Sequence, residues 1–188
     1  LTATPGDGSV TFSWNRVSSD GSPVTALTLN VTPGQSVQLA PGATSATVRV
    51  PNGTSVQATL VATNRQGKSE PSAPSAPVTP FGRPGAFSAN VENTSVNKSG
   101  SDGRGQATVR WTSAPSNGRA IESYTVQAST GENVTVAGNK NSVVMDIAYS
   151  SQPVSFTVTA YNSKNPNSST SANAGSVRIL GSLSAPAG

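Results

Sequence analysis

Val10-Thr11-Phe12-Ser13-Trp14 alternates apolar and polar residues and ends in tryptophan, and it returns 97 residues later as Ala107-Thr108-Val109-Arg110-Trp111. Two further segments repeat in the same order, at offsets of 97 and 98 residues: Leu27 to Val31 with Tyr124 to Ala128, and Val56 to Asn64 with Val154 to Asn162. This offset is the length of a domain and is too long for a solenoid repeat. The sequence therefore predicts two copies of one domain.

An apolar–polar alternation of period two is typical of antiparallel strands that bury one face. Turn sequences such as Pro5-Gly6-Asp7-Gly8 and Pro51-Asn52-Gly53 separate these segments about every 8–12 residues, as in an all-β sandwich. No segment carries the apolar stripe of a helix. We predict an all-β fold: two tandem immunoglobulin-like β-sandwiches of about seven antiparallel strands each.

The phase of the alternation predicts which side chains point inward, and a buried tryptophan is expected at the centre of each core. The inward residues expected in the first domain are Phe12, Trp14, Leu27, Leu29, Val31, Val48, Val50, Val56, Ala58 and Leu60. Those expected in the second are Val109, Trp111, Tyr124, Val126, Val143, Met145, Ile147, Phe156 and Val158. Four aromatic residues are left over, and we favour incidental exposure of their rings over a carbohydrate platform: Phe81, Phe87, Tyr149 and Tyr161.

Composition excludes several classes of site. The chain has no His and no Cys, so Ser-His-Asp, Cys-His and zinc-finger chemistry are excluded, and the eight carboxylates are scattered singly. We expect no catalytic, cofactor or metal site. The net charge is +4 and its cations are dispersed, which disfavours nucleic acid as a partner. No apolar run approaches the roughly 20 residues that cross a bilayer, so direct membrane insertion is not expected.

These segments resemble the fibronectin type III family. Its second strand carries an apolar-x-Trp pattern, matched by Phe12-Ser13-Trp14 and Val109-Arg110-Trp111, and its sixth strand ends in Ala-x-Asn, matched by Ala62-Thr63-Asn64 and Ala160-Tyr161-Asn162. The junction Thr79–Pro84 looks like that of tandem domains in bacterial, especially actinobacterial, surface or secreted proteins. The resemblance implies a non-enzymatic extracellular module.

The expected boundaries are a first domain at 1–80, a linker at 81–84, a second domain at 85–181 and a tail at 182–188. One expectation is that the chain begins inside the first strand, which would then be truncated. We also expect the chain to be a piece of a longer protein. Prolines recur at 71, 74, 77, 80 and 84. They are typical either of a polyproline II spacer or of an edge strand followed by a short link, and we favour an edge strand over Ser75–Thr79.

The fold that the resemblance implies places the turn at Pro51–Thr54 near two loops of the second domain, Ser113–Arg119 and Asn162–Thr170. We therefore predict a partner-binding elbow, with these candidate residues: Asn52, Phe81, Arg119, Asn162, Lys164, Asn165 and Asn167. The turn from Arg65 to Lys68 is expected at the far tip of the first domain.

Three functions stay open. The first is an extracellular protein-binding, adhesion or spacer module of a bacterial surface protein, monomeric and without cofactors. The second is a receptor-like binder of a host extracellular protein, such as a cytokine-type ligand, at the elbow. The third is an accessory module of a secreted glycan hydrolase.

Overall fold

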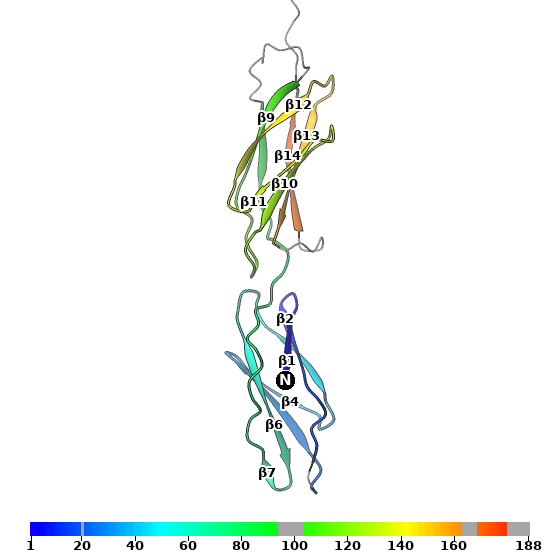
Figure 1. The fold of residues 1–188 in the computed structure, drawn as a ribbon, viewed down its shortest axis with the longest axis vertical. Coiled ribbons are helices and arrows are strands. Elements are labelled where there is room, and N and C mark those ends of the chain that lie inside the picture. Colours follow the sequence, from blue (N-terminus) through cyan, green and yellow to red (C-terminus); the bar gives the residue numbers. More distant parts are fainter. Residues whose placement is uncertain (20, 94–103, 163–168, 180–188) are drawn as a thin grey trace, which may run out of the picture. The chain divides into compact units, whose positions relative to one another are not determined.

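The computed structural model describes residues 1–19, 21–93, 104–162 and 169–179. The chain divides into two compact units, which we call unit 1 (Leu1–Gly82) and unit 2 (Arg83–Gly188). All regular secondary structure in the described ranges is β-strand (Figure 1). No helix that could span a membrane occurs in this part of the chain.

Unit 1 contains seven strands: β1 (Thr2–Pro5), β2 (Ser9–Ser13), β3 (Ala26–Thr32), β4 (Ser36–Leu39), β5 (Ser45–Arg49), β6 (Gln57–Asn64) and β7 (Gly67–Lys68). They form a three-stranded sheet in the order β1-β2-β5 and a four-stranded sheet in the order β4-β3-β6-β7. Every pairing is antiparallel.

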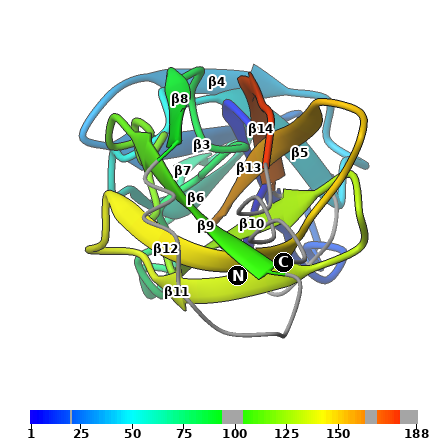
Figure 2. The same ribbon diagram turned by 90° about the horizontal axis from the view of Figure 1, so that it is seen from above.

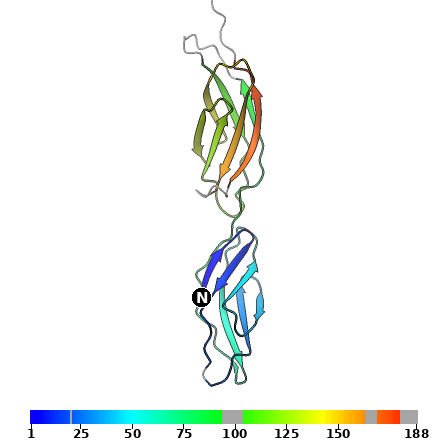
Figure 3. The same cartoon turned by 90° about the vertical axis from the view of Figure 1, so that its right-hand side faces the viewer.

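Unit 2 repeats this arrangement with β8 (Ala89–Asn93), β9 (Arg104–Trp111), β10 (Ser123–Ala128), β11 (Asn133–Ala137), β12 (Ser142–Ala148), β13 (Val154–Tyr161) and β14 (Ser169–Val177). Its sheets are β12-β9-β8 and β11-β10-β13-β14, again antiparallel throughout. Figure 2 shows β9 beside β12, and Figure 3 shows β13 beside β14 in orange and red. Both units thus have one strand order, that of a fibronectin type III-like sandwich, and the predicted fold class is confirmed.

The core of unit 1 forms where the inward residues of the two sheets meet. Phe12, Leu27 and Leu29 are fully buried, as the alternation predicted. Trp14, however, is only half-buried, so the prediction that it forms the core centre is wrong. It lies one residue beyond the end of β2, and its indole Nε1 donates to the Ala43 carbonyl at 2.9 Å. An amphipathic ring at the rim of the core keeps its N–H paired in this way.

The centre of unit 2 is an aromatic cluster built around Tyr124. Trp111 is buried, with its ring centroid 5.2 Å from that of Tyr124, and the Phe87 ring meets Tyr124 edge-on at 5.9 Å. The Tyr124 hydroxyl accepts a hydrogen bond from Ala114 N at 2.8 Å, which satisfies a buried donor. Phe87 and Tyr149 pack against this core. They are therefore not free platforms for a carbohydrate, and each of the nine aromatic side chains, all of them in the described ranges, is buried or half-buried.

The last segment of unit 1 pairs with β6 in an unexpected way. Main-chain N–H groups of Ser69, Ser72, Ser75 and Val78 donate to alternate carbonyls of β6 and Val56, at 2.8–2.9 Å. In this segment, every third residue therefore donates a main-chain hydrogen bond to the sheet, and three residues are also the period of polyproline II. In a regular strand, every second residue would form such bonds. The prediction of an edge strand over Ser75–Thr79 is wrong in this respect, because only Val78 forms a β-bridge, with Val56.

Serine side chains complete this pairing. The hydroxyl oxygens of Ser69, Ser72 and Ser75 accept hydrogen bonds from the β6 N–H groups of Ala62, Leu60 and Ala58 at 3.0–3.1 Å. Prolines 71, 74 and 77 each precede a bonding residue, so the N–H that proline lacks is never needed. The repeated Pro-Ser-Ala therefore lets a proline-rich segment close the edge of a sheet.

Candidate functional site

The predicted partner-binding residues of unit 1 have contacts within that unit. The Asn52 side chain accepts a hydrogen bond from Gly8 N at 2.8 Å and donates to the Asp7 carboxylate at 2.7 Å. Phe81 is half-buried, and its N–H donates to the Gly6 carbonyl at 3.2 Å. Both residues therefore tie the chain to the turn between β1 and β2, which is a structural role.

Arg119 and Asn162 lie in unit 2. Arg119 is exposed and forms an ion pair with Glu122, with Nη2 3.1 Å from Oε1. Asn162 is fully buried and donates to the Ser116 carbonyl at 3.2 Å, so its amide stabilises the loop before β10. Lys164, Asn165 and Asn167 lie outside the described residues. A partner role for these residues stays a prediction.

The first residues of unit 2 are fixed to its own loops. Asn117 Nδ2 donates to the Arg83 carbonyl at 2.9 Å, and the Thr170 hydroxyl donates to the Pro84 carbonyl at 2.5 Å. Gly85 N donates to the Pro115 carbonyl at 2.8 Å, and a Cβ on Gly85 would lie 2.8 Å from the Pro115 side chain. The start of unit 2 is therefore a closely packed part of its sandwich.

The Glu132 carboxylate is held by hydrogen bonds and by an ion pair. It accepts hydrogen bonds from the Thr130 hydroxyl and from Ala148 N, the latter at 3.1 Å, and Arg104 Nη2 lies 3.4 Å away. The Thr130 hydrogen bond, followed by the weaker contributions of Ala148 and Arg104, lowers the pKa of Glu132 despite some opposing desolvation. An ionised acceptor at this position braces the turn before β11 against the end of β12. No group of three acidic residues in the described part of the chain gathers as a metal site requires.

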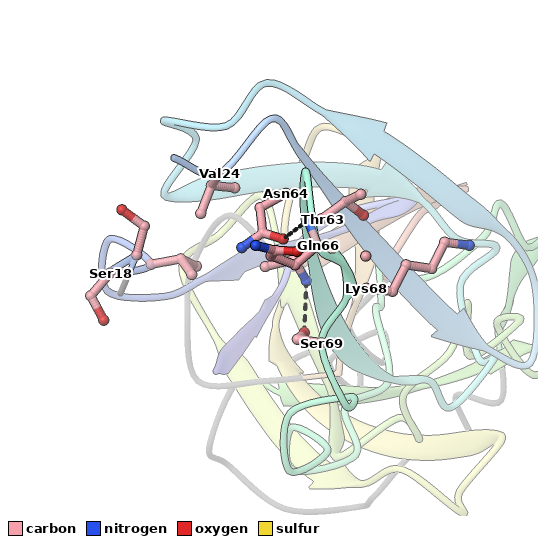
Figure 4. Close-up of a pocket in the computed structure, with 11 residues that line it drawn as sticks. Ser18, Val24, Thr63, Asn64, Gln66, Lys68 and Ser69 are labelled. Atoms are coloured by element: carbon pink, nitrogen blue, oxygen red, sulfur yellow. Dashed lines mark hydrogen bonds between the residues drawn. The ribbon is translucent and has the colours of Figure 1, made fainter. Parts of the chain in front are cut away.

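The structure adds a candidate that the sequence did not identify as a site, a hollow of about 400 Å³ at one end of unit 1. We call it the tip hollow. It lies between the segment after β2 and the β6–β7 hairpin, and it is lined by Val17, Ser18, Ser19, Val24, Ala62, Thr63, Asn64, Gln66, Gly67, Lys68 and Ser69 (Figure 4).

Local hydrogen bonds shape the hairpin side of the tip hollow. Asn64 Oδ1 accepts from Gln66 N at 2.8 Å, which closes the turn, and Gly67 adopts a φ of 131° that side-chain-bearing residues rarely take. Ser69 Oγ accepts from Ala62 N at 3.0 Å. Figure 4 shows Thr63, Asn64 and Gln66 lying between Val24 and Lys68. The polar rim is therefore held in place by main-chain contacts.

The tip hollow has an apolar floor and a polar rim with one lysine. Val17, Val24 and Ala62 belong to the edge of the core, so they supply an apolar floor. None of the described lining residues is acidic. Lys68 lies on the rim and Arg65 lies in the hairpin turn. Arg16 lines a neighbouring hollow that shares four lining residues with this one: Val17, Ser18, Ser19 and Val24. Asp20 of the same segment lies outside the described residues.

The tip hollow thus combines an apolar floor with a polar rim that carries Lys68. A signal for this site was present in the sequence, since the turn from Arg65 to Lys68 contains two cations and follows a strand that ends in asparagine. The hollow itself also needs Val17 and Val24, which are distant in sequence from the hairpin, so only the fold brings them together.

Comparisons with known proteins complete this description. No family model matches the chain, and no curated protein matches it. Among solved structures, one that matches is the FN1-FN3 segment of chicken CNTN1, with 19% sequence identity and a TM-score of 0.39. The match covers 90% of this chain and 63% of that one.

Proposed function

We propose that this chain is a non-enzymatic extracellular module that binds a protein partner through the tip hollow of unit 1 and also acts as a spacer. The observation that carries the proposal is the tip hollow, where an apolar floor lies within a rim that includes Lys68 and no described acid. The composition supports the non-enzymatic part, because the chain offers no histidine or cysteine for acid–base or nucleophilic catalysis.

The partner that fits is an acidic, exposed protein segment. Its carboxylates would meet Lys68 of the rim and Arg65 of the adjacent turn, and one small apolar side chain would lie on the apolar floor. Exposed charge pairs contribute about 0.2–1 kcal/mol each, so a single site of this kind binds weakly. Weak contacts that repeat along a surface protein can add up through avidity. The resemblance to bacterial tandem domains supports the proposal that the module belongs to a bacterial surface protein.

The test uses the full chain labelled with ¹⁵N and a hexaglutamate peptide as the probe, with hexalysine as its charge-reversed counterpart. We expect hexaglutamate to shift the amide signals of Ser18, Gln66 and Gly67, and hexalysine to leave them unchanged. Raising the salt concentration should weaken the effect, because exposed charges are screened.

Lys68→Gln and Arg65→Gln should each weaken hexaglutamate binding about two- to five-fold, the equivalent of one exposed ion pair. Lys140→Gln is the matched control, since Lys140 is an exposed lysine of unit 2. Equal weakening by Lys140→Gln, or shifts that avoid the tip hollow, would refute this assignment.

A further inference from the structure

The outer face of the four-stranded sheet of unit 2 carries no charged residue in its paired rows. The register aligns its outward residues in three rows across β11, β10, β13 and β14. The rows are Ala137, Ser123, Tyr161 and Ser169; Thr135, Thr125, Thr159 and Ser171; and Asn133, Gln127, Thr157 and Asn173. We call these rows together the neutral face, because none of these residues is charged.

The middle row consists of hydroxyl groups that form hydrogen bonds in pairs. Thr125 Oγ1 lies 2.9 Å from Thr135 Oγ1, and Thr159 Oγ1 lies 2.8 Å from Ser171 Oγ. A hydroxyl pair uses one hydrogen for the bond between its members, so the second hydrogen can bond elsewhere. Each pair can therefore donate one hydrogen bond outward and accept others, as a sugar hydroxyl does.

Within unit 2, this composition occurs on one of the two sheets and not on the other. There, Arg110 Nε lies 3.5 Å from Glu92 Oε2, and Gln106 donates to the Asp146 carboxylate at 3.0 Å. Arg104 also donates to the Asp146 carbonyl. Charges therefore occur on β8, β9 and β12, as expected for a solvated surface, but not on the neutral face.

A face without charge suits a partner without charge. Covering an ionised side chain removes it from water at a high cost unless a counter-charge is supplied. Hydroxyl and amide groups can instead exchange the hydrogen bonds they make with water for those of another hydroxyl. The regular spacing of strands, about 4.7–4.9 Å apart, repeats the same groups across the face. The ligand that this pattern fits is a polymer with regularly repeated hydroxyl groups.

We propose that the neutral face of unit 2 binds an uncharged polysaccharide. Sugar hydroxyls would bond to the two hydroxyl pairs of the middle row and to the amides of Gln127 and Asn173. The methyl groups of Thr125 and Thr159 would lie against the C–H surface of the sugar rings. A protein partner fits less well, because protein interfaces are centred on buried aromatic or aliphatic anchors, and the only aromatic residue of this face is Tyr161, at its end.

The probes are cellohexaose and xylohexaose as neutral glycans, and oligogalacturonate as an anionic one, each titrated into the full ¹⁵N-labelled chain. We expect a neutral glycan to shift the amides of Thr125, Gln127, Thr157 and Thr159, and oligogalacturonate to shift none of them. Capture of the chain on insoluble cellulose should follow the same pattern.

Thr159→Val keeps the shape of the side chain and removes its hydroxyl, so it should weaken glycan binding about three- to ten-fold, as the loss of one hydrogen bond does. Thr159→Lys places a charge in the middle row and should abolish binding. Val144→Lys is the matched control, because Val144 is 55% exposed on β12 of the opposite sheet. It should bind glycan as the unchanged chain does.

Three results would overturn the proposal: no shift with either neutral glycan, equal binding of oligogalacturonate, or self-association of the chain that Thr159→Lys abolishes. The last result would identify a second copy of the chain as the partner of this face. The proposal is independent of the tip hollow, since Lys68→Gln should leave glycan binding unchanged and Thr159→Lys should leave hexaglutamate binding unchanged.

Discussion

Ser75→Ala is the substitution for which the structure gives the clearest expected cost. Ser75 is 3% exposed, and its hydroxyl oxygen accepts a hydrogen bond from Ala58 N at 3.1 Å. Alanine removes this acceptor and leaves a buried main-chain N–H without a partner, at a cost of about 1–3 kcal/mol. A central value of about 2 kcal/mol lowers the ratio of folded to unfolded unit 1 about 30-fold.

The same segment supplies two controls with the same chemistry and less burial. Ser72 and Ser69 accept equivalent hydrogen bonds at 3.0 Å from Leu60 N and Ala62 N, but the Leu60 contact is only partly buried and the Ala62 contact is exposed. Water can replace the missing acceptor more easily at these positions. We therefore expect Ser72→Ala to cost about 1 kcal/mol and Ser69→Ala less than about 0.5 kcal/mol.

The assay is urea unfolding of the full chain, followed by the ¹⁵N–¹H signals of unit 1 and unit 2 separately. With a urea dependence of about 1 kcal/mol per M for a domain of this size, Ser75→Ala should lower the unfolding midpoint of unit 1 by about 2 M. The midpoint of unit 2 should not change. Equal losses from all three serines, or a loss below about 0.5 kcal/mol for Ser75→Ala, would refute the idea that the hydroxyl replaces a missing strand partner.

Three other substitutions test unit 2 by the same urea assay. Gly138→Ala would place a Cβ 1.9 Å from the Ile121 carbonyl oxygen, so the main chain must move and we expect a loss of at least about 3 kcal/mol; a loss below 1 kcal/mol would contradict this packing. Tyr124→Phe leaves a buried main-chain N–H unpaired, and it should cost about 1–3 kcal/mol while keeping the ring packing; unchanged stability would argue against the hydrogen bond. The pKa of Glu132 is lowered in the folded state, chiefly by the Thr130 hydrogen bond, so the stabilisation is present above the unfolded-state pKa of about 4.3 and is lost as the pH falls through the lower folded-state value. Glu132→Gln should therefore reduce the stability of unit 2 at pH 7 and flatten its decrease below about pH 4.3, and an unchanged pH profile would contradict this role.

The period-two alternation of the sequence was enough to predict strands, two repeated sandwiches and most of the inward residues, because burial of one sheet face is a local rule. The pattern did not distinguish the two tryptophans. Trp111 lies within β9 and is buried, whereas Trp14 follows the last residue of β2 and is half-buried. How far each strand extends over its partner sheet decides this difference, and that extent depends on contacts between distant segments.

Contacts between distant segments also decided what the sequence pattern could not predict for the segment from Ser69 to Val78 and for the candidate sites. The prolines of this segment predicted either polyproline II or an edge strand. The structure combines the two, because serine hydroxyls supply the acceptors that the main chain does not. For the neutral face, the sequence determined which side chains point outward, since alternation is a property of each strand. Only the tertiary structure determined how the β10–β11 pair stands beside the β13–β14 pair, because the register between β10 and β13 joins strands that are far apart in the chain.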